Sequence, residues 1–402
     1  MSPPPEINLR RSLGFAQSIA ALAALLAACA PTQPAVPDLQ VAWHAHLTGA
    51  VDGTPATRDG MVFAGSAGGD LAAFDAQSGA LRWMRHGLGA ISDSPAVDAG
   101  RVIAGTLNGH VLAFRTADGS TLWDWTGPPD AAIWSSPVVY RALVVVGVAS
   151  PYGDQPLVPG RLVGLDEQTG QETWSQCLIG GCQPGDGVWS TPAIDADGTA
   201  FVGVGNPDDG VLAFDPLTGK AKWLSSFYYD NGRDLDLGAQ PVVVASSSGE
   251  LVIEPSVEGT VAAFDVKSSD VVWARRLVEG SAVHGLIASP AYDGRYLYVA
   301  SASAPNGIFA LTPADGKIAW SHATDLPVYS APAVGGGVVV FGTGAVFGDL
   351  GAGSVVELSV TDGHELGRFN TRSAVRSGPA LAGDIAFVGD YAGDVFALKI
   401  SS

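Results

Sequence analysis

A short motif recurs along most of the chain, and this repetition constrains the fold more than any other feature of the sequence. Each copy starts with Ala-Phe-Asp or a close variant, and most copies continue through a glycine to a tryptophan. Six copies reach their tryptophan, which is Trp83, Trp123, Trp174, Trp223, Trp273 or Trp320. A seventh copy has Gly367 where the tryptophan is expected, and the last copy, residues 397–399, meets the C-terminus before its turn. Trp43 stands 40 residues before Trp83 without a preceding turn, so it is predicted to complete the last copy.

Eight prolines give a second, independent periodicity. Each follows a small or polar residue by one or two positions, and they recur at intervals of 40 to 55 residues, at Pro55, Pro95, Pro137, Pro192, Pro241, Pro290, Pro332 and Pro379. One such unit contains four short strand patterns, at residues 94–97, 101–105, 110–114 and 121–125. Units of this length that cannot bury both faces alone must stack on one another, as propeller blades do. The sequence therefore predicts an all-β, eight-bladed β-propeller of four-stranded antiparallel blades, closed by pairing of the N- and C-terminal strands.

The charge and composition of the chain exclude some classes of function. The 402 residues carry 21 Lys and Arg against 40 Asp and Glu, a formal net charge of −19. A chain this acidic repels nucleic-acid phosphates, whose binding requires a basic surface. Apolar residues make up 47% of the chain, which is ample for a folded core.

The first 28 residues have the layout of an export signal. Arg10 and Arg11 precede an apolar stretch over residues 13–28, which is too short to span a bilayer as a helix. The stretch ends in Leu26-Ala27-Ala28-Cys29, which resembles the bacterial lipobox. That resemblance implies cleavage before Cys29 and acylation of its thiol; a cysteine within an ordinary signal sequence is the alternative. Residues 29–38 contain Pro31, Pro34 and Pro37 and are predicted to form an extended tether before a propeller at residues 39–402.

The signal-like segment and the lipobox together predict an exported protein that is anchored to the cell envelope by lipid. The paired arginines resemble those of a twin-arginine signal, but they are also common in general export signals, so the route stays open. Ala30 is not the aspartate that retains some lipoproteins at the inner membrane. In a bacterium with two membranes the resemblance therefore implies the periplasmic face of the outer membrane, and otherwise the outer face of the plasma membrane.

The repeat resembles the quinoprotein-type propeller repeat, with the pattern Ala-x-Asp-x-x-Thr-Gly-x-x-x-Trp, over about residues 40–402. In that family the tryptophan docks between adjacent blades. The resemblance therefore gives a structural role to Trp43, Trp83, Trp123, Trp174, Trp223, Trp273 and Trp320. It also implies that Gly367 leaves one junction between blades less well packed.

Two families share the eight-bladed form of this repeat. The first consists of quinoprotein dehydrogenases, which bind pyrroloquinoline quinone (PQQ) and calcium; the second is the propeller lipoprotein of the β-barrel assembly machinery, which has no catalysis and implies no cofactor. The lipobox and the lack of long insertions favour the second. This resemblance predicts a monomeric, membrane-anchored scaffold that presents loops or blade edges to envelope proteins or to unfolded client chains.

A PQQ- and calcium-binding dehydrogenase, or a non-catalytic relative that keeps the cofactor pocket, remains the alternative, because part of the chain resembles the cofactor site of those enzymes. Trp189 and Asn206 match the positions of the tryptophan under the quinone and of an asparagine that binds calcium. Residues 230–239 are similar to an Asp-rich segment of those enzymes. Asp215 falls near their catalytic base, but it is also the aspartate of the repeat. Where they have a calcium-binding glutamate, Asp154 would have to substitute.

The remaining candidate site residues are two cysteines and two histidines. Cys177 and Cys182 are separated by four residues, unlike the adjacent cysteines of those enzymes, and in an exported protein they are predicted to form a local disulfide. Two free thiols are the alternative. His44 and His46 share one face of a strand, but two ligands without a third make a weak metal site.

Overall fold

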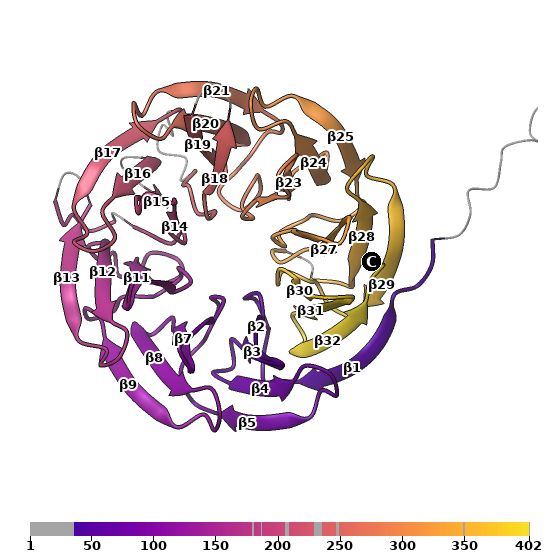
Figure 1. The fold of residues 1–402 in the computed structure, drawn as a ribbon, viewed down its shortest axis with the longest axis horizontal. Coiled ribbons are helices and arrows are strands. Elements are labelled where there is room, and N and C mark those ends of the chain that lie inside the picture. The colour runs from indigo at the N-terminus through magenta and orange to yellow at the C-terminus, as the bar shows by residue number, and fades with distance from the viewer. Residues whose placement is uncertain are drawn as a thin grey trace, which may run out of the picture. The chain divides into compact units, whose positions relative to one another are not determined.

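Strands follow one another in groups of four along the part of the chain that the computed structural model describes, residues 36–178, 181–185, 187–205, 209–228, 235–246, 249–348 and 350–401. Each group forms one antiparallel sheet, and the eight sheets, here called blades 1 to 8, are arranged in a ring (Figure 1). The eight-bladed all-β propeller predicted from the repeat is thereby confirmed. The compact unit begins at Pro37.

The first four blades run in chain order from the innermost strand outward. Blade 1 consists of β2 (Ala56–Arg58), β3 (Met61–Gly65), β4 (Leu71–Asp75) and β5 (Leu81–Arg85). Blade 2 consists of β6 (Ala96–Asp98), β7 (Arg101–Gly105), β8 (His110–Arg115) and β9 (Thr121–Thr126). Blade 3 consists of β10 (Val138–Tyr140), β11 (Leu143–Val148), β12 (Arg161–Asp166) and β13 (Glu172–Cys177). Blade 4 consists of β14 (Ala193–Ile194), β15 (Ala200–Val204), β16 (Gly210–Phe214) and β17 (Ala221–Ser226).

The remaining blades repeat this order until the chain closes on itself. Blade 5 consists of β18 (Val242–Ser246), β19 (Gly249–Pro255), β20 (Thr260–Asp265) and β21 (Val271–Arg276). Blade 6 consists of β22 (Ala291–Tyr292), β23 (Leu297–Ser301), β24 (Gly307–Leu311) and β25 (Ile318–Ala323). Blade 7 consists of β26 (Ala333–Gly335), β27 (Val338–Thr343), β28 (Gly353–Ser359) and β29 (Glu365–Thr371). Blade 8 consists of β30 (Ala380–Ala382), β31 (Ile385–Gly389), β32 (Asp394–Lys399) and, as its outer strand, β1 (Gln40–His46).

Local sequence explains the outer hairpin of each blade. In blade 1, Asp75 Oδ1 accepts hydrogen bonds from the backbone N–H of Ser78 (2.9 Å) and from its hydroxyl (2.7 Å), which fixes the turn between β4 and β5. Gly79 completes this turn at φ 71°, a conformation that favours glycine. The repeated aspartate and glycine therefore make the turn that joins the third strand to the fourth.

The repeated tryptophans seal seven of the seams between blades. At the seam between blades 1 and 2, the Trp83 ring lies on Gly119, where an added Cβ would stand 2.6 Å from the ring. Trp83 Nε1 donates a hydrogen bond to Thr116 O at 2.7 Å, across the same seam. Equivalent Nε1 bonds to the neighbouring turn are made by Trp43, Trp123, Trp223, Trp273 and Trp320. The repeat thus forms the hairpin turn of one blade and the contact with the next.

The seam between blades 7 and 8, here called the closing seam, is built differently. Gly367 stands at the tryptophan position of β29, and the Leu39 side chain fills the space, since a Cβ at Gly367 would lie 2.4 Å from Leu39 Cδ2. Leu39 N donates to Arg368 O (2.9 Å) and Arg368 N donates to Pro37 O (3.0 Å). The looser packing expected at Gly367 is therefore not found, because residues just before β1 cover this seam.

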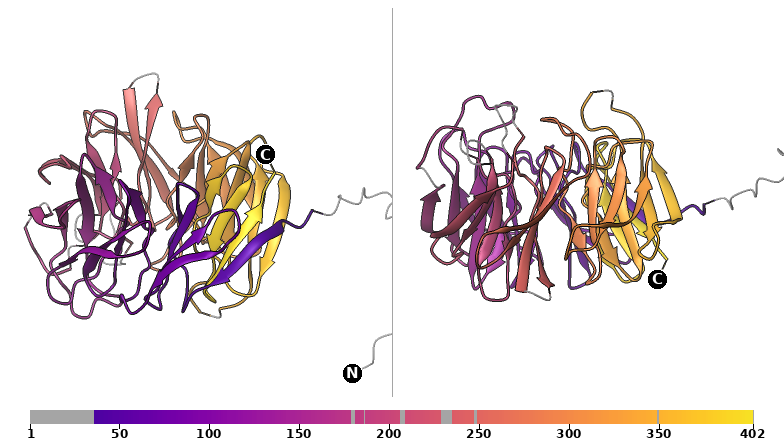
Figure 2. Two further views of the ribbon diagram at one scale, coloured as in Figure 1. Left: turned by 60° about the horizontal axis from the view of Figure 1, so that its bottom comes forward. Right: turned by 90° about the horizontal axis from the view of Figure 1, so that it is seen from above.

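The two ends of the described chain meet in blade 8, as predicted. β1 pairs antiparallel with β32, and Figure 2 shows β1 in indigo beside the yellow C-terminal strands. Cys29, the predicted signal peptide at residues 1–28 and most of the tether at 29–38 lie outside the described residues. No helix within the described ranges is long and apolar enough to cross a bilayer.

Candidate functional site

Eight equivalent positions, each three residues before a strand-opening proline, vary while the rest of the repeat stays regular. They lie next to the innermost strands of the ring (Figure 1). In chain order from blade 1 they are Asp52, Ser92, Trp134, Trp189, Gly238, Ile287, Tyr329 and Arg376. We call this set the inner ring; chemistry specific to this chain is best sought in such variable positions on a rigid scaffold.

Hydrogen bonds between successive blades hold the backbone beneath the inner ring. Thr54 N donates to Ser94 Oγ (2.9 Å), and Ser94 N donates to Ser136 Oγ (3.0 Å). Between blade 8 and blade 1, Ser377 Oγ donates to Gly53 O at 2.9 Å. These bonds link one blade to the next and fix the positions from which the inner-ring side chains project.

Trp189 is the predicted site residue that the structure places most clearly. Its ring packs over Gly238, where an added Cβ would stand 1.7 Å from the ring, so only glycine is tolerated there. Trp189 Nε1 donates to Asp236 Oδ2 at 3.1 Å. A Cβ at Gly205 would lie 2.7 Å from the same oxygen, which places the Asp236 carboxylate beside Gly205. Asn206, the predicted calcium ligand, lies outside the described residues.

Glu254 is a buried carboxyl close to this position. It lies in β19, and a Cβ at Gly203 would stand 3.0 Å from its Oε1. Both carboxylate oxygens are buried without a hydrogen-bond partner. Burial alone raises the pKa of Glu254 well above its usual value, so the group holds its proton under conditions where an exposed glutamate is charged.

These residues partly fit a quinone and calcium site. An aromatic ring held by a glycine contact suits a flat platform, and Asp236 and Glu254 supply oxygen, the donor that calcium prefers. Among the residues that the structure describes, however, no three His, Cys, Asp or Glu side chains are already set around a metal position.

A different set of side chains occupies the inner ring near the closing seam. Asp52 Oδ2 accepts a hydrogen bond from Ser92 Oγ at 3.2 Å; burial raises the pKa of this carboxyl, and the Arg376 guanidinium opposes the shift. Tyr329 OH donates to Val283 O (2.9 Å), and burial raises the pKa of this phenol to about 12. This half of the ring carries a cation, a buried carboxyl and a neutral phenol, whereas the half around Trp189 has an aromatic ring with carboxyl groups.

The other sequence candidates have structural surroundings. Asp215 caps its hairpin turn, accepting from Leu217 N (2.9 Å) and from Thr218 Oγ1 (3.0 Å), as Asp75 does in blade 1. Asp154 lies in a turn in which its N–H donates to Pro151 O at 3.0 Å. The structure joins Cys177 and Cys182 in a disulfide with a Cα separation of 4.9 Å.

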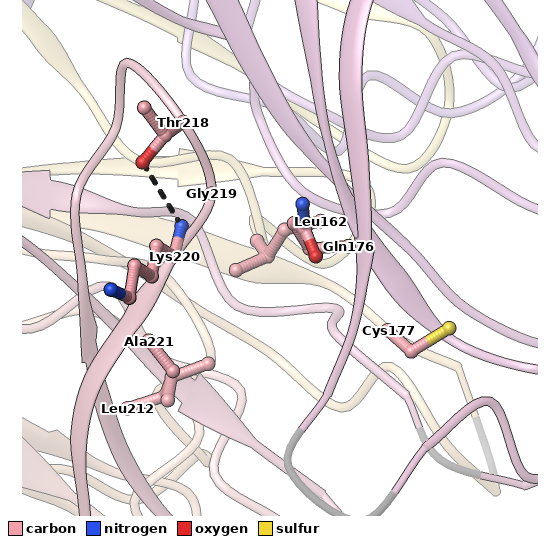
Figure 3. A pocket seen from close by; sticks show the side chains of 8 residues that line it. All are labelled: Leu162, Gln176, Cys177, Leu212, Thr218, Gly219, Lys220 and Ala221. Carbon is pink, nitrogen blue, oxygen red and sulfur yellow. Dashed lines mark hydrogen bonds between the residues drawn. The ribbon is translucent and has the colours of Figure 1, made fainter.

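A pocket of about 520 Å³ opens away from the inner ring, between blades 3 and 4 (Figure 3). It is lined by the end of β13 and the start of β17, including Gln176, Cys177 and Lys220. Trp174 seals this seam in an unusual orientation: a Cβ at Gly164 would lie 2.3 Å from its Nε1, which is buried without a hydrogen-bond partner. Among the described residues that line this pocket, none carries a carboxylate or an imidazole that could act as an acid or base.

The sequence interpretation did not single out Glu254 or Arg376. A signal for Glu254 exists, because it interrupts an apolar strand at a position where blades 1 and 2 have Ala64 and Ala104. Arg376 could have been found by comparing the residues that precede the eight prolines. Both require the blades to be aligned with one another in detail.

Comparisons with known proteins agree with this architecture. A family model described as outer membrane protein assembly factor BamB matches residues 37–273 and 257–402. The crystal structure of BamB from Moraxella catarrhalis superposes with a TM-score of 0.68 at 17% identity, covering 90% of this chain and 98% of that one. Quinohemoprotein alcohol dehydrogenase from Comamonas testosteroni superposes with a TM-score of 0.77 at 16% identity, covering 91% and 77%. At these identities the two structures show the shared fold alone.

Sequence relatives include two polyvinylalcohol dehydrogenases. The protein from Pseudomonas sp is 26% identical over 264 residues, which is 52% of this chain and 41% of that protein. The protein from Sphingopyxis sp. (strain 113P3) is 26% identical over 216 residues, 40% of this chain and 33% of that protein. The chain thus spans less than half the length of these curated relatives.

Proposed function

The chain belongs to the family of outer membrane protein assembly factor BamB, and we propose that it acts as a non-catalytic scaffold that binds proteins of the cell envelope. The observation that carries the proposal is the extent of the family match, which covers the ring from blade 1 to blade 8. The alignment with the Pseudomonas dehydrogenase covers about half of the chain.

Family membership and the disulfide of Cys177 and Cys182 indicate a place outside the cytoplasm. We further propose that Cys29 carries the lipid that anchors the propeller to the membrane. An acylated and N-terminally modified cysteine bears two or more chains, and each buried CH₂ contributes about 0.8 kcal/mol, so the anchor is stable where a single chain is marginal.

Affinity purification tests the scaffold. The tagged full chain is solubilised from membranes and compared with Cys29→Ser. Wild type is expected in the membrane fraction with outer-membrane assembly proteins bound, and Cys29→Ser in the soluble envelope fraction or as an uncleaved precursor. Recovery of no envelope protein with the wild type contradicts the scaffold. Mature protein that begins elsewhere than Cys29 contradicts the anchor.

A second candidate function is favoured by the surroundings of Trp189. Its ring over Gly238, its bond to Asp236 and the nearby buried Glu254 support a proposal that the inner ring binds PQQ with calcium. Bound there, the quinone would supply an electrophilic carbonyl that accepts electrons from an alcohol. In this proposal Trp189 supports the ring, and Asp236, Asn206 and Glu254 offer oxygen ligands.

Titration with PQQ and calcium separates the two candidates. Binding that is lost in Trp189→Ala but kept in Trp134→Ala, the equivalent tryptophan of the preceding blade, supports the cofactor site. Oxidation of alcohols by the loaded protein would make it an enzyme. Absence of binding to the wild type removes the second candidate and leaves the scaffold in place.

A further inference from the structure

Two histidines of the first strand and one aspartate of the last strand meet on the exposed face of blade 8. His44 Nε2 and His46 Nδ1 each lie 2.9 Å from the same oxygen, Asp394 Oδ1. In the β1–β32 ladder, His46 stands opposite Asp394 and His44 stands opposite Phe396. Cross-strand partners share one face of a sheet, so the three side chains are set side by side by backbone pairing. The sequence interpretation found the two histidines but lacked a third partner, which comes from almost 350 residues away.

The three side chains offer a recognised set of donor atoms. Two imidazole nitrogens and one carboxylate oxygen suit divalent ions such as zinc and its transition-metal neighbours. In the tetrahedral sites that zinc prefers, bonds of about 2.05 Å place the donor atoms about 3.3 Å apart. Both nitrogen–oxygen separations here are 2.9 Å, the length of a hydrogen bond, so the donor atoms need to move apart by only a few tenths of an ångström to admit an ion.

The three side chains are accessible to an ion, and neighbouring residues hold two of them in place. The side chains of His44, His46 and Asp394 are 49%, 61% and 24% exposed, so an ion can reach them. The Phe396 ring stacks on His44 with centroids 5.1 Å apart, and the backbone N–H of Asp394 donates to Asp390 Oδ1 at 3.0 Å. Three other aspartate contacts, made by His86, His110 and His364, bring one imidazole to one carboxylate.

We propose that His44, His46 and Asp394 bind a divalent transition-metal ion of the zinc class, and that the ion clamps β1 to β32. The three side chains are hydrogen-bonded to one another rather than already set around a metal position. Binding therefore replaces these bonds after rotation of the exposed imidazoles about χ2, which is a broad torsion. Because two ligands come from the first strand and one from the last, metal binding stabilises the closure of the ring.

Calorimetric titration of the purified full chain with Zn²⁺, together with thermal unfolding, tests the proposal. Wild type is expected to bind one equivalent and to unfold at a higher temperature with Zn²⁺, whereas Ca²⁺, which prefers oxygen donors, has no such effect. The double variant His44→Ala/His46→Ala and the isosteric Asp394→Asn are each expected to lose at least about tenfold in affinity, the loss seen even for partners of metal ligands. Both should also lose the shift in unfolding temperature.

His110→Ala is the matched control, because His110 and Asp124 form a similar contact with a single imidazole. It should keep the affinity and the Zn²⁺-dependent shift of the wild type. Unfolding without metal shows that each variant is folded, and Asp394→Asn keeps an acceptor for both histidines. The proposal is overturned if wild type binds no Zn²⁺, if the ligand variants bind as tightly as His110→Ala does, or if binding leaves the unfolding temperature unchanged.

Discussion

At the seam between blades 1 and 2, Trp83 lies on Gly119 and donates a hydrogen bond to Thr116 O. At the closing seam, Leu39 lies on Gly367, and backbone bonds join residues 37 and 39 to Arg368. The difference follows from the strand order of blade 8. A tryptophan in β29 would need the outer hairpin turn of blade 8, but the outer strand of this blade is β1, so no hairpin turn joins β32 to it. The segment that leads into β1 passes over β29 and replaces the tryptophan.

The largest effect is expected from removing the closure itself. A chain without residues 1–47 loses β1, Leu39 and Trp43, so blade 8 lacks its outer strand and two seams lose their fillers. We expect the free energy of unfolding to fall by more than about 5 kcal/mol, because loss of a buried tryptophan alone costs about 3–5 kcal/mol. Thermal unfolding measures the effect against a control chain that lacks only residues 1–36. Equal melting temperatures for the two chains would contradict the role of β1.

The architecture could be predicted from the sequence because each repeat carries its own turn and its own inter-blade contact. Asp75 and Gly79 fix the hairpin turn of their own blade, and Trp83 contacts the equivalent turn of the next blade. Each copy of the repeat therefore predicts one blade and its contact with the next blade. Leu39 at the closing seam could not be predicted, because its neighbour Gly367 is remote in sequence and a single leucine matches no motif.

The candidate site was predictable only in part, for a related reason. Trp189 was found through resemblance to another family, but its partner Asp236 and the nearby Glu254 depend on how blades 4 and 5 face each other. Asp394 is brought to His44 and His46 by pairing between the ends of the chain. Residue spacing within the repeat predicts the turn and the tryptophan contact of each blade, whereas these contacts involve residues that are not part of the repeated motif.

The next largest loss of stability is expected when the tryptophan of a single seam is removed. Trp83→Ala removes a ring that is 7% exposed and a hydrogen bond, and it leaves a cavity beside Gly119. We expect a loss of about 3–5 kcal/mol in the free energy of unfolding, measured by chemical denaturation. Trp125→Ala, which removes a more exposed tryptophan of β9, serves as the control and should cost less. Trp125 also donates to Glu172 of the next blade, so the two variants differ mainly in how deeply the ring is buried. Equal losses would mean that the deeper burial of Trp83 adds nothing to stability.

Substitutions at the closing seam should lower the free energy of unfolding by less than Trp83→Ala does. The side chain that fills this seam is smaller, and the backbone hydrogen bonds across the seam remain. Leu39→Ala is expected to lower the free energy of unfolding by about 2 kcal/mol, near the lower end for a buried leucine. Gly367→Trp alone should also destabilise, since the new ring would overlap Leu39. If Leu39 stands in for the missing tryptophan, combining the two changes should cost less than the sum of the single effects. Strict additivity in a double-mutant cycle would show that the two positions do not share a space.

The smallest effect should come from the tryptophan seam whose turn lacks glycine. Trp223 donates to Val266 O at 3.1 Å across the seam between blades 4 and 5, but the neighbouring turn has Ser269 at φ 64° where other blades have glycine. A left-handed backbone costs a residue with a Cβ about 1–2 kcal/mol. Ser269→Gly removes that cost but increases the entropy of the unfolded chain, so the net gain is expected to be about 0.5 kcal/mol. The reverse change, Gly79→Ser, should be clearly destabilising, because its Cβ would stand 2.7 Å from the Trp43 ring at φ 71°. Chemical denaturation of both variants provides the measurement. A loss of stability in Ser269→Gly would show that the serine side chain contributes to its seam what glycine alone provides at the others.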